Sequence, residues 1–244
     1  MLNTFLLRLL KNKGYHIFSD AVFKRNYRSR SEFNPLEQLF YERLHPDFFY
    51  IQIGANDGVS FDPIFRLISE EKVRGLALEP LPDIFEKLKV NYAGQPQVTL
   101  VNKALHNEEK AMTLYRVNQA LKKYPDWTKG TASFNKAHHE KSGIDPADIV
   151  EEKVSCISWG ELLKSYSVQH VDLLQIDTEG YDYHIIRMID FEQLAPSIIS
   201  FEHGLRDGVM TWQQFHEIEE LLVRNNYNLI VLKHDAIAYK RLDG

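Results

Sequence analysis

One stretch of the sequence, residues 48–59, constrains the fold more than any other. Its first half is a run of aromatic and branched aliphatic residues with a single glutamine, and such a run is typical of a strand buried on both faces of a parallel sheet. Its second half is a turn in which Gly54 and Gly58 bracket Asn56 and Asp57. Because these residue types tolerate left-handed backbone, a ligand can come close to the main chain there.

Residues 60–68, which follow this turn, carry apolar side chains at helical spacing and predict a helix. The turn therefore opens onto a helix N-terminus with unpaired N–H groups. A strand, a glycine-containing turn and a helix in this order form the nucleotide-facing unit of a doubly wound α/β fold.

The rest of the chain continues the alternation of strands and helices. Further strands are predicted at 74–80, 97–102, 110–117, 152–157, 171–176, 197–201, 227–232 and 236–241. Helices are predicted at 34–41, 82–89, from 158 onward, at 181–189 and at 211–225. The connection between the last two strands is so short that they should pair antiparallel. The expected fold is Rossmann-like, with a doubly wound, mostly parallel sheet and an antiparallel last strand.

Length and composition fit one α/β domain with an additional N-terminal segment. The 244 residues are 44% hydrophobic and 26% charged, which suffices for a full core. We divide the chain into a basic helical segment over 1–45 and a main domain over 46–244. Within the main domain, residues 118–150 lack clear periodicity and predict an insertion of the kind that often covers or recognises a substrate. The N-terminal segment is expected to act as a lid, as a homodimer contact or, at most, as a peripheral membrane contact.

The charge distribution and the single cysteine exclude several classes of function. Residues 1–45 carry eight Lys and Arg side chains against four acids, which leaves a net charge of −9 on the main domain. An acidic domain argues against nucleic-acid binding across its face. The single cysteine, Cys156, excludes an internal disulfide and a thiolate metal cage and indicates a reducing, cytoplasmic location. No run reaches the roughly 18 apolar residues that a membrane helix requires.

Polar residues follow the carboxyl ends of the predicted core strands. These residues are Gly54–Gly58, Glu79, Asn102, Asp177–Gly180 and Glu202–His203. In an open parallel sheet, ligands bind outside the carboxyl ends of the strands. The sequence therefore predicts one site that these residues share.

Glu79 and the first turn together indicate which cofactor fits this site. Glu79 stands 25 residues beyond Gly54, about where an acid accepts the ribose hydroxyls of an adenosine cofactor, although it could instead cap a helix. A dinucleotide needs Gly-x-Gly-x-x-Gly, but Asn56 and Val59 occupy the later glycine positions. The sequence also has no phosphate-binding Gly-Lys-Ser/Thr loop. A cofactor without phosphates fits better, and S-adenosylmethionine is the common one.

Five sequence blocks, spread over roughly residues 48–205, resemble the FkbM family of S-adenosylmethionine-dependent methyltransferases. They are IGANDG at 53–58, LEP at 78–80, NKAL at 102–105, GTAS at 130–133 and, most specifically, VDLLQIDTEG at 171–180. The resemblance implies a class I methyltransferase fold with seven strands and a reversed last strand. It also implies O-methylation, typically of sugar or polyketide hydroxyls.

The same resemblance assigns cofactor contacts to residues of this chain. Gly54, Asn56 and Gly58 would flank the methionine part of the cofactor, Glu79 would bind the ribose, and Asn102 would lie near the adenine.

Two positions depart from the usual methyltransferase pattern. Gln52 stands where an acid is usual, and Asn56 stands where a glycine is usual. The methionine ammonium is therefore expected to bind the carboxylate of Asp57 or Asp177 instead. These departures also leave open a catalytically inactive domain that serves binding or scaffolding.

His203, Glu179 and Asp177 are the candidates for the base that takes up the proton of a hydroxyl acceptor. Imidazole titrates near neutrality, which favours His203 as base, while a core or substrate-binding histidine is the alternative. Glu179 belongs to the most specific sequence block but could only anchor a helix N-terminus. Asp177 and Glu202, with His203, are also candidate ligands for a divalent metal ion that would lower the pKa of a substrate hydroxyl.

The insertion adds two further hypotheses. His138 and His139 are expected on the surface, because adjacent residues on a loop are poor ligands for one ion. Trp127, Phe134 and Tyr124 either form a platform that stacks on a sugar or simply pack the insertion.

The sequence as a whole predicts an S-adenosylmethionine-dependent O-methyltransferase. Its acceptor would be a hydroxyl of a sugar, a glycan or another small molecule, and nucleic acid is not expected as a partner. The inactive binding or scaffold domain remains the alternative, and cofactor binding separates the two.

Overall fold

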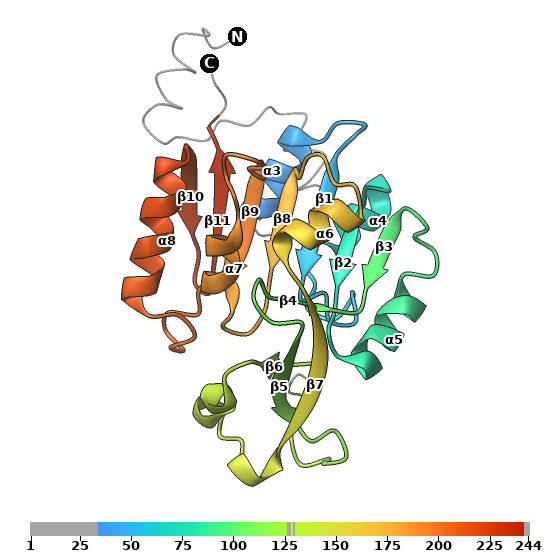
Figure 1. The fold of residues 1–244 in the computed structure, drawn as a ribbon, viewed down its shortest axis with the longest axis vertical. Helices are drawn as coiled ribbons and strands as arrows, with labels where there is room; N and C mark the ends of the chain where they lie inside the picture. Colours follow the sequence, from blue (N-terminus) through green and yellow to red (C-terminus); the bar gives the residue numbers. More distant parts are fainter. Residues whose placement is uncertain (1–33, 126–127, 129, 242–244) are drawn as a thin grey trace, which may run out of the picture.

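The computed structural model describes residues 34–125, 128 and 130–241, and it is built around a seven-stranded sheet (Figure 1). The strand order is β10-β11-β9-β8-β1-β2-β3. These strands are β1 Phe49–Ile53, β2 Arg74–Leu78, β3 Val98–Val101, β8 Leu173–Ile176, β9 Ile198–Glu202, β10 Tyr227–Val231 and β11 Asp235–Lys240. All neighbours pair in parallel except β11, which is antiparallel to both β9 and β10. The predicted doubly wound sheet with a reversed last strand is confirmed.

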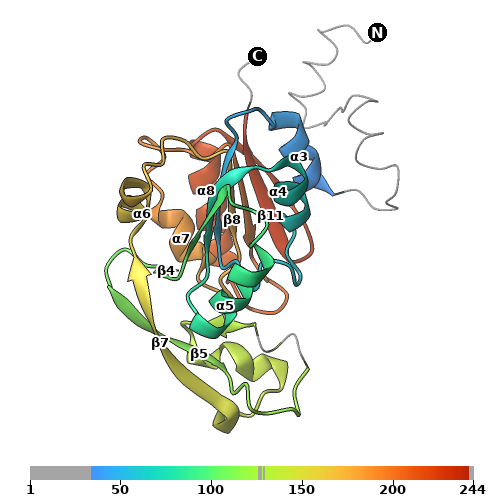
Figure 2. The ribbon, with the colours of Figure 1, turned by 90° about the vertical axis from the view of Figure 1, so that its right-hand side faces the viewer.

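Helices cover both faces of this sheet (Figure 2). One face carries α3 Pro35–Arg43, α4 Phe65–Glu71 and α5 Pro82–Asn91, and the other carries α6 Trp159–Ser165, α7 Asp182–Met188 and α8 Trp212–Arg224. Alternate residues of the central strands point into the two resulting cores. Tyr50 and Leu173 pack with the α3 side, whereas Ile51 and Leu174 pack with the α6 side. Burial on both faces explains why these strands are almost continuously apolar.

The predicted helix starts at Asn34 and Ser158 are confirmed. Asn34 accepts hydrogen bonds from Leu36 N and Glu37 N, and Ser158 forms a capping box with Glu161. These caps satisfy backbone N–H groups that have no partner within the helix.

The helix predicted from residue 60 begins only at Phe65, so its predicted start was wrong. The side chain of Asp62 explains the late start, because its Oδ1 accepts Ile64 N at 2.7 Å and Phe65 N at 2.8 Å. Ahead of it, Phe61 is left-handed, with φ 60°. The carboxylate therefore closes a turn before the helix can begin.

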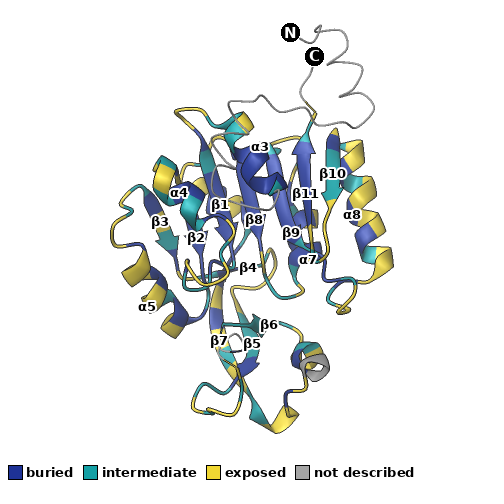
Figure 3. Cartoon of the chain, turned by 180° about the vertical axis from the view of Figure 1, so that it is seen from behind, coloured by how far each residue is buried: buried dark blue, intermediate teal, exposed yellow. Residues whose placement is uncertain are grey.

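The predicted insertion over 118–150 is part of a small second sheet at the carboxyl end of the main strands (Figures 1 and 3). Its strands, in the order β4-β7-β5-β6, are β4 Ala104–Leu105, β5 Ala111–Val117, β6 Ala132–Ser133 and β7 Ile149–Ile157. Two 3₁₀ segments, Lys136–Ser142 and Pro146–Asp148, lie between β6 and β7. Because β7 begins at Ile149, the last residues of the predicted loop belong to a strand.

Helix α3 is part of the main core rather than of a separate segment. Leu36, Leu39 and Phe40 are buried in the same cluster as β1, and the rings of Phe40 and Phe48 meet edge to face at 5.0 Å. Residues 1–33 of the predicted basic helical segment lie outside the described residues. In the part of the chain that is described, no helix has the length and apolar character to span a membrane.

Candidate functional site

The carboxyl ends of β1 and β8 approach each other so closely that Gly54 has no room for a side chain. Gly54 is left-handed, with φ 82°, and a Cβ atom there would lie 1.8 Å from the carbonyl oxygen of Asp177. After β1 the chain crosses to β2 on one side, while β8 flanks β1 on the other side. This is the point where strand order reverses, and open α/β sheets bind ligands there.

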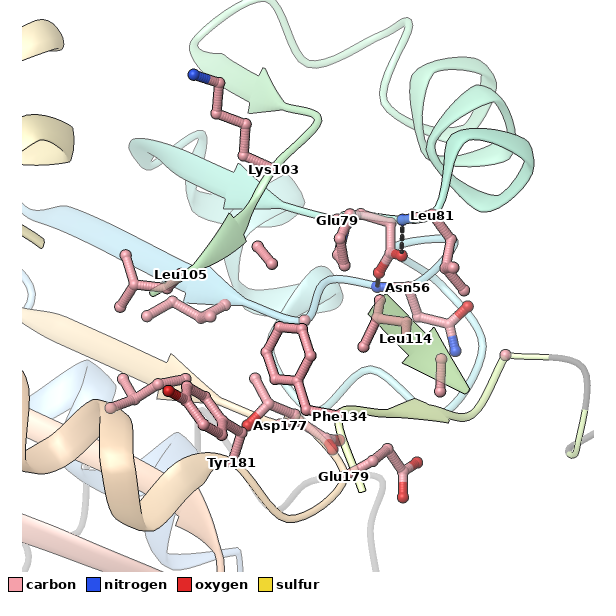
Figure 4. Close-up of a pocket in the computed structure, with 18 residues that line it drawn as sticks. Asn56, Glu79, Leu81, Lys103, Leu105, Leu114, Phe134, Asp177, Glu179 and Tyr181 are labelled. Atoms are coloured by element: carbon pink, nitrogen blue, oxygen red, sulfur yellow. Dashed lines mark hydrogen bonds between the residues drawn. The ribbon is translucent and has the colours of Figure 1, made fainter. Parts of the chain in front are cut away.

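A cavity opens directly above this point (Figure 4). Its walls come from the ends of β1, β2 and β8, from the segment around β4, and from the insertion. The predicted residues Gly54, Asn56, Glu79, Asp177 and Glu179 all line it. The structure therefore brings these five together as the sequence predicted.

Glu79 is the buried acid of this cavity. It is 5% exposed, and its carboxylate accepts Asn56 N at 3.0 Å and Leu81 N at 2.9 Å (Figure 4). Burial raises the pKa of Glu79 to about 7, although the two backbone donors oppose this shift. Leu81 is also the N-cap of α5. Glu79 thus holds the β1 turn and the start of α5 together while it lines the cavity.

Aromatic side chains form another wall of the cavity. The rings of Phe134 and Tyr181 meet edge to face, 4.9 Å apart (Figure 4). The ring of His184 stacks on Tyr181 at 4.7 Å. Of the two predicted platform residues that the structure describes, Phe134 lines the cavity and Tyr124 does not. The hydroxyl of Tyr124 bonds to the carboxylate of Asp148 within the insertion, and Trp127 lies outside the described residues.

Asp177 lies at the floor of the cavity with its side chain accessible to solvent. Protein atoms nevertheless enclose it closely, and desolvation is the main cause that raises the pKa of Asp177 well above its usual range. The charges of Glu179 and Asp182 add to the increase. Asp182 is fully buried and accepts Thr178 Oγ1 at 2.6 Å and Glu202 N at 3.1 Å, so it ties the end of β8 to the end of β9.

Glu179 is held by the insertion at two points. Its carbonyl oxygen accepts a hydrogen bond of 2.7 Å from Ser133 Oγ, and its Oε2 lies 3.0 Å from His138 Nε2. Its backbone is left-handed, with φ 53°, a conformation that costs free energy unless its surroundings impose it. The prediction of surface histidines was wrong, because His138 contacts Glu179 and His139 is only 2% exposed.

A second cavity adjoins the first on the side of the loop that precedes α4. Gly54, Asn56, Asp177 and Glu179 line both cavities. The residues found only in the second include Gln52, Ser60, Phe61, Asp62, Thr131 and Gln175. The junction between the two cavities is therefore built from the glycine turn and from two carboxylates.

Three residues predicted to contact the cofactor line neither cavity: Asp57, Gly58 and Asn102. The carboxylate of Asp57 accepts Val59 N and Ser60 N at 3.0 and 2.7 Å, so it shapes the turn. Asn102 donates to the carbonyl oxygens of Glu79 and Pro80 at 2.8 and 3.1 Å and braces the loop after β2.

His203 is turned away from the cavities. It is 2% exposed, its Nδ1 accepts Leu205 N at 3.2 Å, and its Nε2 lies 3.2 Å from the carbonyl oxygen of Leu232. Because both ring nitrogens have partners in the fold, His203 is the core histidine that was its alternative interpretation. Across the described residues, no three His, Cys, Asp or Glu side chains are grouped to hold a metal ion, so the proposed set with Asp177 and Glu202 does not form.

Sequence reasoning missed three residues of the site. Tyr181 directly follows the DTEG turn, and its position at a predicted helix start could have indicated it. Asp62 also stands just ahead of a helix, where acids cap. His138 lies in a segment without periodicity, so nothing in the sequence connected it with Glu179.

Comparison with known proteins identifies the family. The model of the methyltransferase FkbM domain matches residues 52–229. The chain belongs to the FkbM methyltransferase family. No curated protein matches the chain. The matched range of this FkbM protein contains the glycine turn, Glu79, the insertion and the DTEG turn.

Solved methyltransferase structures resemble this FkbM protein distantly. A precorrin-6y C5,15-methyltransferase from Geobacter metallireducens GS-15 is 15% identical, with a TM-score of 0.44 over 83% of this chain and 85% of its own. The methyltransferase PaMTH1 of Podospora anserina, solved with S-adenosylhomocysteine bound, is 12% identical, with a TM-score of 0.42 over 99% and 97%. The class I fold of the FkbM protein rests on its strand order rather than on these likenesses.

Gly54→Ala is predicted to destabilise the protein severely. The added Cβ atom would overlap the Asp177 carbonyl, and alanine disfavours φ 82°, so we expect a loss above about 3 kcal/mol in the free energy of unfolding. The control is Gly160→Ala in α6, where a Cβ atom meets nothing within 4 Å and helix propensity should add roughly 0.5–1 kcal/mol. Urea unfolding measures both, and equal stability of the two variants would contradict the close approach.

The raised pKa of Glu79 predicts that its contribution to stability falls as pH rises. Since the folded pKa of about 7 exceeds the ordinary glutamate pKa of 4.5, the folded state binds more protons between these two pH values. From about pH 4 to about pH 8, wild type should lose about 3 kcal/mol more than Glu79→Gln. Urea unfolding across this range gives the difference, and identical pH profiles would show that the pKa of Glu79 is not raised.

Proposed function

We propose that this FkbM protein uses S-adenosylmethionine to methylate a hydroxyl group of a sugar, a glycan or another small molecule. The observation that carries the proposal is the placement of Glu79. A buried carboxylate directly follows β2 and lines a cavity at the point where strand order reverses. This arrangement suits the two ribose hydroxyls of an adenosine cofactor, which are donors that a carboxylate accepts.

The residues of the first cavity fit such a cofactor in several respects. Gly54 exposes backbone where a side chain would block the approach, Glu79 offers carboxylate oxygens, and Phe134 and Tyr181 offer aromatic surface. Bound there, S-adenosylmethionine supplies an electrophilic methyl group on a sulfonium. Among the described lining residues, Lys103 is the only Lys or Arg, which agrees with a cofactor that lacks phosphates.

We assign Glu179 as the base that takes up the proton of the acceptor hydroxyl. It lies at the junction of the two cavities. A hydroxyl held in the second cavity would there face the methyl group of a cofactor held in the first. Its carboxylate takes the hydroxyl proton as the oxygen is methylated. His138 positions this carboxylate through the 3.0 Å contact with Oε2, and Ser133 fixes its backbone. Positioning of this kind and proton transfer both contribute to catalysis.

The inactive scaffold remains the alternative outcome. Gln52 and Asn56 are the reason for it, because an acid and a glycine are usual at these positions. Asp62 places a carboxylate oxygen 2.9 Å from Gln52 Nε2, so a charge does lie beside this position. This contact supports an active methyltransferase over an inactive scaffold.

Isothermal titration with S-adenosylhomocysteine tests the cofactor site. We expect micromolar binding by wild type and at least a tenfold loss in Glu79→Ala, because about 1.5 kcal/mol or more goes with each hydrogen bond to a charged group. Glu86→Ala, which removes an exposed acid from α5, is the matched control and should bind like wild type. Absence of binding by wild type would favour the scaffold.

Glu179→Gln is predicted to separate catalysis from cofactor binding. Transfer of labelled methyl from S-adenosylmethionine to a panel of sugars should identify an acceptor, and the variant should transfer at least about 100-fold more slowly. His138→Gln should be slowed about tenfold, and both variants should bind S-adenosylhomocysteine within about twofold of wild type. The control is His170→Gln, which changes a half-exposed histidine before β8. Unchanged rates in Glu179→Gln would exclude it as the base.

A further inference from the structure

Phe61 is the most exposed large hydrophobic side chain in the described part of the chain. It is 88% exposed and stands in the loop between β1 and α4. The same residue lines the second cavity, which Glu179 also lines. An aromatic ring that stays in water gains little hydrophobic stabilisation, so packing of the core does not explain an aromatic residue at this position.

The backbone at Phe61 is held in a conformation that costs free energy. With φ 60°, Phe61 is the only apolar residue with left-handed backbone among the described residues other than glycine. The carboxylates of Asp57 and Asp62 impose this conformation, because they accept backbone N–H groups of the loop before and after it. A strained residue that its surroundings maintain points to a function. Here the loop holds an aromatic ring where the second cavity meets the solvent.

The other groups that line the second cavity suit hydroxyls. Thr131 of the insertion contributes a hydroxyl, Asp62 and Glu179 contribute carboxylates, and Gln175 contributes an amide. Gln175 is 5% exposed, and its Oε1 has no hydrogen-bond partner within the described residues. Because a buried acceptor without a donor is costly, this oxygen favours a ligand that donates hydrogen bonds.

The charge of the lining argues against an anionic ligand. Asp62, Asp177 and Glu179 all line the second cavity, whereas no Lys, Arg or His is found among its described lining residues. A phosphate or carboxylate group would meet like charges there and find no cation to pair with. The cavity thus combines an aromatic face with hydroxyl-binding groups and disfavours negative charge. A neutral sugar matches all three features, because its ring has C–H groups on its faces and hydroxyls around its edge.

We propose that Phe61 stacks on the ring of a neutral sugar acceptor in the second cavity and selects such sugars over anionic ones. The inference rests on the proposed function and names the class of its acceptor. The aromatic face covers the C–H face of the sugar ring, while the carboxylate and amide oxygens accept its hydroxyls. One of these hydroxyls then faces Glu179. Phe61 determines specificity and takes no part in the proton transfer.

Sugar binding to protein saturated with S-adenosylhomocysteine tests this stack. The panel consists of methyl glycosides of neutral hexoses and deoxyhexoses, with glucuronate and the phosphate ester of glucose as anionic members. Saturation-transfer NMR gives their affinities and shows which sugar protons lie against the protein. We expect at least one neutral sugar to bind, with the anionic members at least about tenfold weaker. Saturation should be strongest on the C–H protons of one face of the ring.

Variants at position 61 separate stacking from simple apolar contact. Phe61→Ala should bind the best neutral sugar at least about fivefold more weakly, the loss expected for one stacked ring. Phe61→Trp should retain the affinity because it keeps an aromatic face, and Phe61→Leu should not. In methyl transfer to that sugar, Phe61→Ala should raise KM by a similar factor and leave kcat within about twofold, because the ring binds ground state and transition state alike.

Trp212→Ala is the matched control for these variants. It removes an aromatic side chain that is 73% exposed and lines neither cavity, so sugar affinity and KM should not change. Phe61→Gly adds a test of the fold, since glycine adopts φ 60° without strain. Its midpoint in urea should equal or exceed that of wild type while its sugar affinity falls. A lower midpoint with unchanged sugar affinity would show that Phe61 serves the fold and would overturn the proposal.

Two further results would also overturn it. They are unchanged sugar affinity in Phe61→Ala and the absence of binding by every neutral sugar. Methyl transfer to a hydroxyl compound that is not a sugar would refute the stack and leave the proposed function standing. If the proposed function fails instead, S-adenosylhomocysteine does not bind and no methyl group is transferred. The sugar titrations of the free protein and of Phe61→Ala then decide on the stack alone.

Discussion

The close approach of Gly54 to Asp177 is the contact on which the rest of the site depends. Two parallel strands, β1 and β8, end side by side, and the absence of a side chain at Gly54 lets the turn of one press against the end of the other. The glycine turn then reaches across to Glu79, which binds its backbone at Asn56. One small residue thereby sets the position of the carboxylates that face the two cavities.

The insertion forms part of the site and holds one of its carboxylates in place. Ser133 and His138 hold Glu179 by its backbone and its side chain, and Phe134 packs on Tyr181 in the wall of the first cavity. In return, the turn after β8 gives the insertion its anchor on the main sheet. One short segment thus holds the proposed base and also forms part of the wall of the first cavity.

The fold was predictable because its signals are local. Apolar runs marked the central strands, and side-chain caps at Asn34 and Ser158 marked helix starts. Gly54 and Glu79 were predictable as site residues because sheet geometry alone places strand ends together. The start of α4 was misplaced because the side chain of Asp62 satisfies the backbone ahead of that helix, and residue periodicity does not report such a contact.

The errors within the site have a common physical cause. His203 follows a core strand as Glu79 does, but its ring packs inward and both nitrogens find partners there. His138 contacts Glu179, which lies 41 residues away along the chain. Side-chain direction and long-range contacts of this kind depend on tertiary packing, which the order of residues in a strand or loop does not encode.

A crystal structure of the protein with S-adenosylhomocysteine would test the central claim most directly. The account predicts that both ribose hydroxyls lie within hydrogen-bond distance of the Glu79 carboxylate, with the adenosine in the first cavity and the amino-acid end toward Asp177. An adenosine bound elsewhere, with Glu79 still bonded only to Asn56 and Leu81, would contradict it.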